Sequence, residues 1–358
     1  MCGIVGVLGN HQASPILIEG LKRLEYRGYD SAGIATVNGG HLERRRALGK
    51  LVNLSDALVH DPLAGTAGIG HTRWATHGAA NTTNAHPHQR GRVAVVHNGI
   101  IENYRALRAR LEAHRITSET ETDTETVAML CDWHLGQGLA PVEAARATIS
   151  ELEGAYALCF LFQGEDDLIV AARKGSPLAI GWGEGEMFVG SDALALAPMT
   201  SEITYLEEGD LAIVSRAGAE FRDADHQPVT RARKTVDLEV TTTDKAGHRH
   251  YMSKEIAEQP GVLANALKYY TADREGRHLI EAGVDFTAYD RIVMVACGTA
   301  SLAWTWKIHS GKVSTAVIAA STGPGPCGTS TTPRNALTGL SGTSRVQVET
   351  WSRASASR

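Results

Sequence analysis

Short apolar runs alternate with polar turns along the first 240 residues, and most of these runs have the length of a β-strand. The first run, residues 4–8, ends at Gly9-Asn10, which favours a buried strand closed by a turn. Further runs predict strands at residues 33–37, 68–74, 93–99, 155–162, 168–172, 178–180, 187–190 and 210–214.

Other segments carry apolar residues at helical spacing. In residues 15–24 they fall at Ile16, Leu17, Leu21 and Leu24. Helices are also predicted at residues 104–114, 125–136 and 141–152. Strands outnumber helices and do not alternate strictly with them, so a doubly wound parallel sheet is disfavoured. The pattern indicates an α+β domain over about residues 2–240, with sheets covered by helices.

The pattern changes after residue 240. Residues 241–246 are polar and are predicted to form a linker, which a helix with Ile256, Val262 and Leu263 follows. The apolar run 291–296 predicts a strand that leads into a small-residue turn starting at Cys297. Such a turn suits phosphate, because backbone N–H groups point outward there.

Composition shifts again at about residue 303. The last segment is crowded with Ser, Thr, Gly, Ala and Pro, and Glu349 is its only acidic residue. We expect residues 303–358 to be mostly disordered, with an irregular but ordered region as the alternative.

Overall composition is that of a globular protein, with 43% apolar and 21% charged residues. The net charge of −5 gives no electrostatic reason to expect nucleic acid as a partner. No apolar stretch approaches the length of a membrane span, and no secretory signal is apparent. The five cysteines form no CxxC pair, which favours free thiols in a reducing compartment. A cytoplasmic protein without a membrane partner is therefore expected.

Cys2 is the first candidate for chemistry, because it directly follows Met1. Loss of Met1 would leave a residue with a thiol and a free α-amine, whose pKa near ~7.7–8 lets it take the thiol proton. Nucleophile and base would then come from one residue. The alternative is a small buried residue at the start of a strand.

Two polar clusters follow predicted strands. Arg73, in the segment of residues 71–78, could bind a carboxylate with its bidentate fork, although a loop arginine is more often a solvated charge. Asn98 and Gly99 could offer a side-chain amide and a backbone N–H to an oxyanion. An Asn-Gly turn of type I′ is the alternative for this pair.

Two further groups leave the chemistry open. The acidic run at residues 121–125 could cap a helix, or its Asp123 could bind an ammonium group. His86, His88 and His97 suggest a metal, but no carboxylate or cysteine lies at ligand spacing, so no metal is expected. These histidines are expected to face solvent or to lie in the core.

Together and in this order, five segments carry a resemblance to a known family: residues 2–6, 24–33, 71–78, 96–103 and 121–125. The chain resembles the glutamine–fructose-6-phosphate aminotransferases (isomerising), which make an amino sugar, over about residues 2–302. Residues 249–260 resemble the interdomain helix of that family. The run at residues 26–33 favours it over other class II glutamine amidotransferases, such as amidophosphoribosyltransferase and asparagine synthetase, which remain the near alternatives.

The resemblance implies catalytic roles for three residues. Cys2, after the loss of Met1, is expected to attack the side-chain amide carbon of L-glutamine, with its own α-amine handling the proton. Asn98 and Gly99 are expected to stabilise the oxyanion. Neither a metal nor an organic cofactor is implied for this reaction.

The resemblance also implies a glutamine pocket. Arg73 is expected to bind the α-carboxylate of glutamine and Asp123 its α-ammonium group. Thr76 and His77 are expected to line the same pocket, and Trp74 to close the passage for ammonia.

The implied architecture is a four-layer αββα Ntn-hydrolase sandwich. The expected domains are a glutaminase domain at residues 2–240, a linker and interdomain helix at 241–290, the start of an α/β sugar isomerase domain at 291–302, and an unmatched tail at 303–358. The family's isomerase half binds fructose 6-phosphate and dimerises. Because the resemblance stops near residue 302, sugar amination is doubtful, and a monomer stays open.

The compositional break leads to the hypothesis of a shifted reading frame near residue 303, which sequencing of the DNA would test. Three functional alternatives remain: a chain with glutaminase activity alone, a nonproductive fragment, and a glutamine-binding regulator that is no enzyme. The complete set of pocket residues favours the first, since a pure binder does not require the thiol.

Overall fold

The computed structural model describes residues 2–236, 246–271, 292–297 and 316–321. The chain divides into two compact units, Met1–Gly247 and His248–Arg358, and each is described by itself.

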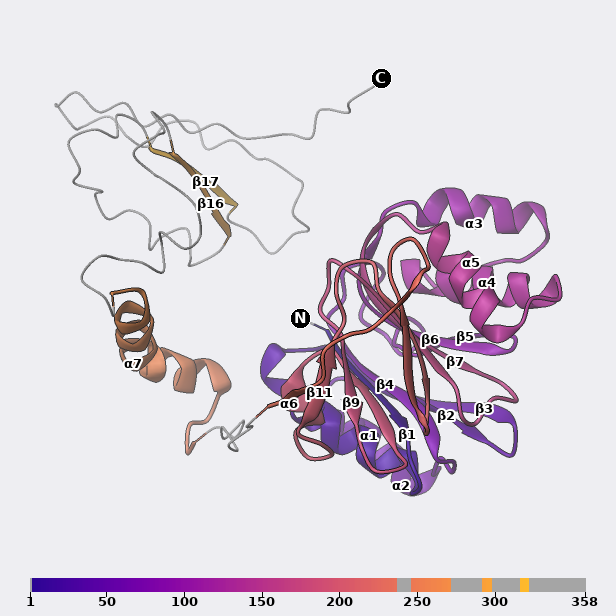
Figure 1. Cartoon of the computed structure of the whole chain (residues 1–358), viewed down its shortest axis with the longest axis horizontal. Coiled ribbons are helices and arrows are strands. Elements are labelled where there is room, and N and C mark those ends of the chain that lie inside the picture. Colours follow the sequence, from indigo (N-terminus) through magenta and orange to yellow (C-terminus); the bar gives the residue numbers. More distant parts are fainter. Residues whose placement is uncertain (1, 237–245, 272–291, 298–315, 322–358) are drawn as a thin grey trace. The chain divides into compact units, whose positions relative to one another are not determined.

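The first unit contains two antiparallel sheets (Figure 1). One has the strand order β15-β11-β9-β10-β1-β4-β2-β3 and the other β14-β13-β12-β8-β7-β6-β5. The strands of the first are β1 (Gly3–Leu8), β2 (Ser31–Asn38), β3 (His41–Leu48), β4 (Ala67–Arg73), β9 (Ala179–Trp182), β10 (Met187–Gly190), β11 (Glu202–Tyr205) and β15 (Lys234–Thr235). Those of the second are β5 (His88–Arg90), β6 (Val93–Ile101), β7 (Gly154–Phe162), β8 (Ile169–Lys174), β12 (Leu211–Ser215), β13 (Gly218–Arg222) and β14 (Pro228–Val229).

Helices cover the outer face of each sheet. The eight-stranded sheet packs against α1 (Ala13–Lys22), α2 (Leu51–His60) and the short α6 (Ala193–Leu196). The seven-stranded sheet packs against α3 (Tyr104–Ala113), α4 (Asp123–Gly136) and α5 (Pro141–Ser150). A 3-10 turn, η1 (Glu25–Arg27), follows α1.

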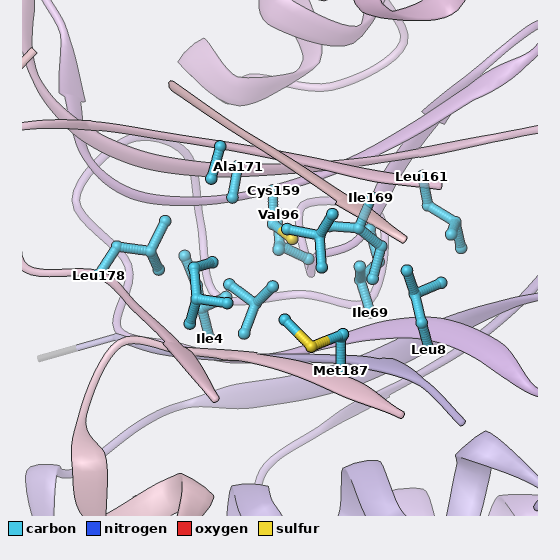
Figure 2. Packing of buried hydrophobic residues seen from close by; sticks show 14 of the residues in the cluster. Ile4, Leu8, Ile69, Val96, Cys159, Leu161, Ile169, Ala171, Leu178 and Met187 are labelled. Atoms are coloured by element: carbon cyan, nitrogen blue, oxygen red, sulfur yellow. The ribbon is translucent and has the colours of Figure 1, made fainter. Parts of the chain in front are cut away.

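The core between the sheets follows from strand alternation. Ile4 and Leu8 of β1 face the second sheet, where they meet Val96 and Leu161 (Figure 2). Val5 points to the opposite face, where it packs in the cluster with α1. The layers are therefore helix, sheet, sheet and helix, which confirms the expected four-layer αββα sandwich.

Most strands and helices lie where the apolar pattern predicts them, within a few residues. The elements β3, α2, β5, α6, β11 and β13–β15 were not predicted; most of them are polar or short, but α2 is an amphipathic ten-residue helix that the prediction missed. One local interpretation was wrong. Asn98 and Gly99 lie neither at a strand end nor in a turn, because β6 continues through both and pairs with β7 up to Ile101.

In the second unit the structure describes α7 (Tyr251–Thr271), which contains Pro260, and two paired parallel strands, β16 (Ile292–Cys297) and β17 (Ala316–Ser321). The helix and strand predicted there correspond to α7 and β16. β17 falls in the segment expected to be disordered, so that expectation does not hold for its six residues. The rest of that segment, most of the expected linker and the residues after Cys297 lie outside the described residues. Within the described part of the chain, no helix is both long and apolar enough to cross a membrane.

Candidate active site

Cys2 directly precedes β1, next to β4 in the first sheet. β1 and β4 are antiparallel, so the start of β1 meets the end of β4, and Gly3 pairs with Thr72. The residues after β4 therefore pass beside Cys2. The backbone N–H of Trp74 donates to the Cys2 Sγ at 3.2 Å, and the thiol lies 3.5 Å from the Trp74 carbonyl oxygen.

A small pocket opens at Cys2. Its lining contains the predicted residues Cys2, Arg73, Trp74, Thr76, His77, Gly99 and Asp123, together with His86, His97, Thr122 and Thr124. Asn98 is the one predicted residue outside this lining. Its Nδ2 donates to the main-chain oxygen of Cys2 at 3.3 Å, so the structure brings all the predicted site residues together.

The guanidinium of Arg73 is buried beneath its own loop. It donates to the carbonyl oxygen of Ala79 at 3.2 Å, to that of Gly78 at 3.3 Å and to that of His77. Burial lowers the pKa of Arg73, while the charges of Asp30 and Cys2 act in the opposite direction. Among the described residues none accepts from its Nε, so part of the fork is available to a ligand.

Two residues that the sequence did not assign hold this loop. The Glu121 carboxylate accepts from the Ala79 N–H at 3.0 Å and from the buried Asn84 amide at 2.9 Å. The first of these bonds, and then the second, lowers the pKa of Glu121. Asn84 also donates to the Ala79 oxygen at 3.0 Å. The acidic run at residues 121–125 thus holds in place the loop that follows Arg73.

Asp123 is the first residue of α4, and it is buried in the pocket wall. Its carboxylate accepts from the Ile101 N–H at 2.9 Å and from the Thr124 N–H at 3.0 Å. The capping side chain is Thr122, which accepts from the Glu125 N–H. A carboxylate at the start of a helix is stabilised by the helix dipole, so Asp123 supplies a fixed negative charge to the pocket.

Gly99 has a backbone that only glycine adopts without strain. Its φ is +130°, and a Cβ built there would lie 2.0 Å from the Ala155 carbonyl oxygen on the neighbouring strand. The Asn98-Gly99 pair is therefore a local distortion inside β6, next to the nucleophile, and not a hairpin turn.

A group of buried histidines backs the pocket. His71 and His86 lie with ring centroids 4.3 Å apart, and His86 and His88 with centroids 4.7 Å apart. Burial lowers the pKa values of these three and of His97, to about 3 for His71, so the rings are neutral near pH 7. Among the residues described, no group of three His, Cys, Asp or Glu side chains is arranged to hold a metal ion. His71 and Thr124 could not be identified as site residues from spacing alone.

Burial has the largest effect on the pKa of the Cys2 thiol and raises it. The Trp74 N–H and the positive charge of Arg73 act against that rise. A nucleophile, a fixed cation and a fixed anion thus share one pocket, an arrangement suited to an amino acid with both an α-carboxylate and an α-ammonium group.

Comparisons with known proteins agree with this chemistry. A family model described as "Glutamine amidotransferase domain" matches residues 71–198. The glutamine–fructose-6-phosphate aminotransferase (isomerizing) of Brucella suis is 54% identical over 306 residues, which are 85% of this chain and 50% of that protein. The protein of the same name from Caulobacter vibrioides is 50% identical over 303 residues, with the same coverage. This chain therefore spans about half the length of the curated relatives that it matches.

Solved structures show the same fold. Glutamine phosphoribosylpyrophosphate amidotransferase from B. subtilis, complexed with ADP and GMP, superposes with a TM-score of 0.54 and 26% identity, over 63% of this chain and 50% of that one. A structure described as the allosteric regulatory enzyme of purine biosynthesis gives the same TM-score with 27% identity, over 62% of this chain and 49% of that one. The chain therefore carries a glutamine amidotransferase domain with the four-layer Ntn-hydrolase fold, and over 85% of its length it is similar to the glutamine–fructose-6-phosphate aminotransferases.

Proposed function

We propose that these residues hydrolyse the side-chain amide of L-glutamine, with Cys2 as the nucleophile. The observation that carries the proposal is the placing of the Cys2 sulfur in one small pocket with Arg73 and Asp123. This is the glutamine-hydrolysing half of the reaction that the relatives' name describes.

Recognition of the amino-acid end rests on opposite charges. The Arg73 fork binds the α-carboxylate of glutamine, and Asp123 binds its α-ammonium group. Thr76 and His77 complete the wall of the pocket, and the His77 ring is packed edge-on against Tyr104 with centroids 5.5 Å apart. The side-chain amide then points to the sulfur of Cys2.

The reaction proceeds through a thioester. Removal of Met1 exposes the α-amine of Cys2, which takes the thiol proton, directly or through a water molecule. The sulfur attacks the amide carbon, and the Asn98 amide and the Gly99 N–H stabilise the oxyanion. The C–N bond breaks, and the nitrogen takes up the proton and leaves as ammonia. Water then adds to the γ-glutamyl thioester and releases glutamate and the free thiol.

Trp74 lines the pocket together with Cys2. Its side chain is 54% exposed, and its ring lies 3.0 Å from the position of a Cβ on Gly28. We propose that it closes the passage through which ammonia leaves. Amination of fructose 6-phosphate is not proposed for these 358 residues, because the described pocket accounts for glutamine hydrolysis alone.

Glutamate release from glutamine tests this function. We expect the chain to release glutamate and ammonia in equal amounts, and Cys2→Ala to abolish the release. Cys131→Ala is the matched control, because Cys131 is buried in the helical layer and its thiol pKa is raised to about 12. This variant should keep the wild-type rate.

Two outcomes would overturn the proposal. Equal glutamate release by the wild type and by Cys2→Ala would show that Cys2 is not the nucleophile. No release by a folded wild type that still binds glutamine would favour the regulator or the nonproductive fragment.

A further inference from the structure

His71 connects the two sheets of the first unit. It lies on β4, where it pairs with Ile4 of β1 and with Gly33 of β2, and it is completely buried. Its ring crosses to β6 of the other sheet, where the Nε2 atom lies 3.0 Å from the His97 carbonyl oxygen and 3.0 Å from the Asn98 Oδ1.

The contact with His97 fixes the proton of the imidazole. A backbone carbonyl can only accept a hydrogen bond, so the Nε2 atom must carry the hydrogen. Burial lowers the pKa of His71 to about 3, so the ring is neutral and has one N–H. The His71 Nδ1 is then an unprotonated atom, and no described residue bonds to it.

The same N–H fixes the orientation of the Asn98 amide. The end of the amide that faces a donor must be its oxygen, so the Oδ1 lies against His71 and the Nδ2 points the other way. On that side the Nδ2 donates to the main-chain oxygen of Cys2 at 3.3 Å. We propose that His71 is a positioning residue, which holds the Asn98 amide with its N–H groups toward the nucleophile and so prepares the oxyanion site.

Packing holds His71 in turn. The His86 ring lies against it with centroids 4.3 Å apart, and the His86 Nε2 is 2.9 Å from the Thr124 hydroxyl. The His86 main chain approaches so closely that a Cβ on Gly33 would lie 2.2 Å from its oxygen. The imidazole therefore has little room to rotate away from Asn98.

The inference rests on the proposed glutaminase function, and it is tested by comparing His71→Leu with His71→Gln. Leucine fills the space but has no donor, whereas glutamine carries an N–H near the position of Nε2. We expect His71→Leu to lower kcat for glutamine hydrolysis by about 10²-fold, as loss of one oxyanion donor does, with KM nearly unchanged. His71→Gln should restore a large part of kcat. His134→Gln replaces a histidine that contacts Glu151 instead of Asn98 and does not line the pocket, and it serves as the matched control, with kcat unchanged.

A double-mutant cycle shows whether His71 acts through Asn98. Because His71 serves only to orient the amide, His71→Leu should have almost no further effect on kcat in the Asn98→Ala background. Alkylation of Cys2 by iodoacetamide needs no oxyanion site, so its rate should be the same in the wild type and in His71→Leu. This readout separates a misplaced amide from a damaged fold.

Three results would overturn the inference. One is a wild-type kcat in His71→Leu. The second is equal losses in the leucine and glutamine variants, and the third is additive losses in the cycle. A wild type that hydrolyses no glutamine would instead refute the proposed function itself.

Discussion

The backbone N–H of Trp74 donates to the sulfur of Cys2 at 3.2 Å, across 72 residues of sequence. This bond offers a donor to the thiolate in a place where burial otherwise raises the pKa of the thiol. The next residue, Ala75, is fixed by its own N–H, which donates to the Asp30 carboxylate at 2.6 Å. Asp30 thus determines where the backbone around Trp74 lies relative to the nucleophile.

Substitution of Asp30 by alanine should therefore disturb catalysis from a distance. Release of the Ala75 N–H lets the loop move away from Cys2, and we expect kcat for glutamine hydrolysis to fall roughly 10- to 100-fold. Steady-state assays of glutamate release measure the effect. Asp56→Ala, on the exposed side of α2, is the matched control and should leave kcat unchanged. Equal activity of the two variants would contradict the role of Asp30.

Gly99 should tolerate no side chain. Its positive φ and the Ala155 oxygen, 2.0 Å from a built Cβ, mean that Gly99→Ala must displace β6 from β7. We expect a loss of roughly 2–4 kcal/mol in the free energy of unfolding, together with the loss of glutaminase activity. Urea unfolding measures the first effect. At Gly136 on α4 a Cβ meets nothing within 4 Å, so Gly136→Ala should not destabilise the protein, and similar losses for both variants would refute this account.

The charges of the pocket should act on substrate binding. Asp123→Asn removes the charge that faces the ammonium group, and it keeps an acceptor oxygen for only one of the Ile101 and Thr124 N–H groups. We expect KM for glutamine to rise about 10- to 100-fold, the equivalent of one charge-assisted hydrogen bond, with a smaller change in kcat. Asp132→Asn lies on the same helix, where its carboxylate accepts from the Arg92 N–H, and should leave KM unchanged. An unchanged KM in Asp123→Asn would exclude the ammonium role.

The buried histidines should make stability depend on pH. Their pKa values are lowered in the folded state, so the unfolded chain, with values near ~6.5, binds more protons below that pH. Stability is thus fully present above about pH 6.5 and is lost as the pH falls toward the folded value, which is about 3 for His71. Each such group adds a slope of up to roughly 1.4 kcal/mol per pH unit.

Urea unfolding between pH 7.5 and 5 measures how the free energy of unfolding depends on pH. Replacement of the buried His88 by glutamine should make the slope shallower, while replacement of the exposed His11 should not. Equal slopes in the two variants and the wild type would show that the histidines are not neutral in the fold.

Short apolar runs were sufficient to predict the strands that form the core, since β1 and β7 are nearly continuous apolar runs and β6 begins with one. This signal failed at β3, whose residues include Glu43 and three consecutive arginines. β3 is the edge strand of its sheet, where charged side chains can reach solvent, so its sequence has no apolar signal.

The residues of the site could be predicted from the sequence, but the residues that hold them in position could not. Cys2, Arg73 and Asp123 could be assigned from their order along the chain and from the family resemblance, and the structure brings them together. The bond from His71 to Asn98 joins strands of different sheets. Spacing in the sequence carries no information on such a contact, which depends on how the sheets pack.

The central claim is that Cys2, freed of Met1, forms a γ-glutamyl thioester. Acid quenching of the protein during glutamine turnover, followed by mass spectrometry of its N-terminal peptide, tests this claim most directly. We predict a peptide that begins at Cys2 and gains the mass of one γ-glutamyl group, and that loses this adduct in Cys2→Ala. Glutamate release by a protein that retains Met1, or turnover without an adduct on Cys2 under conditions that preserve thioesters, would contradict the account.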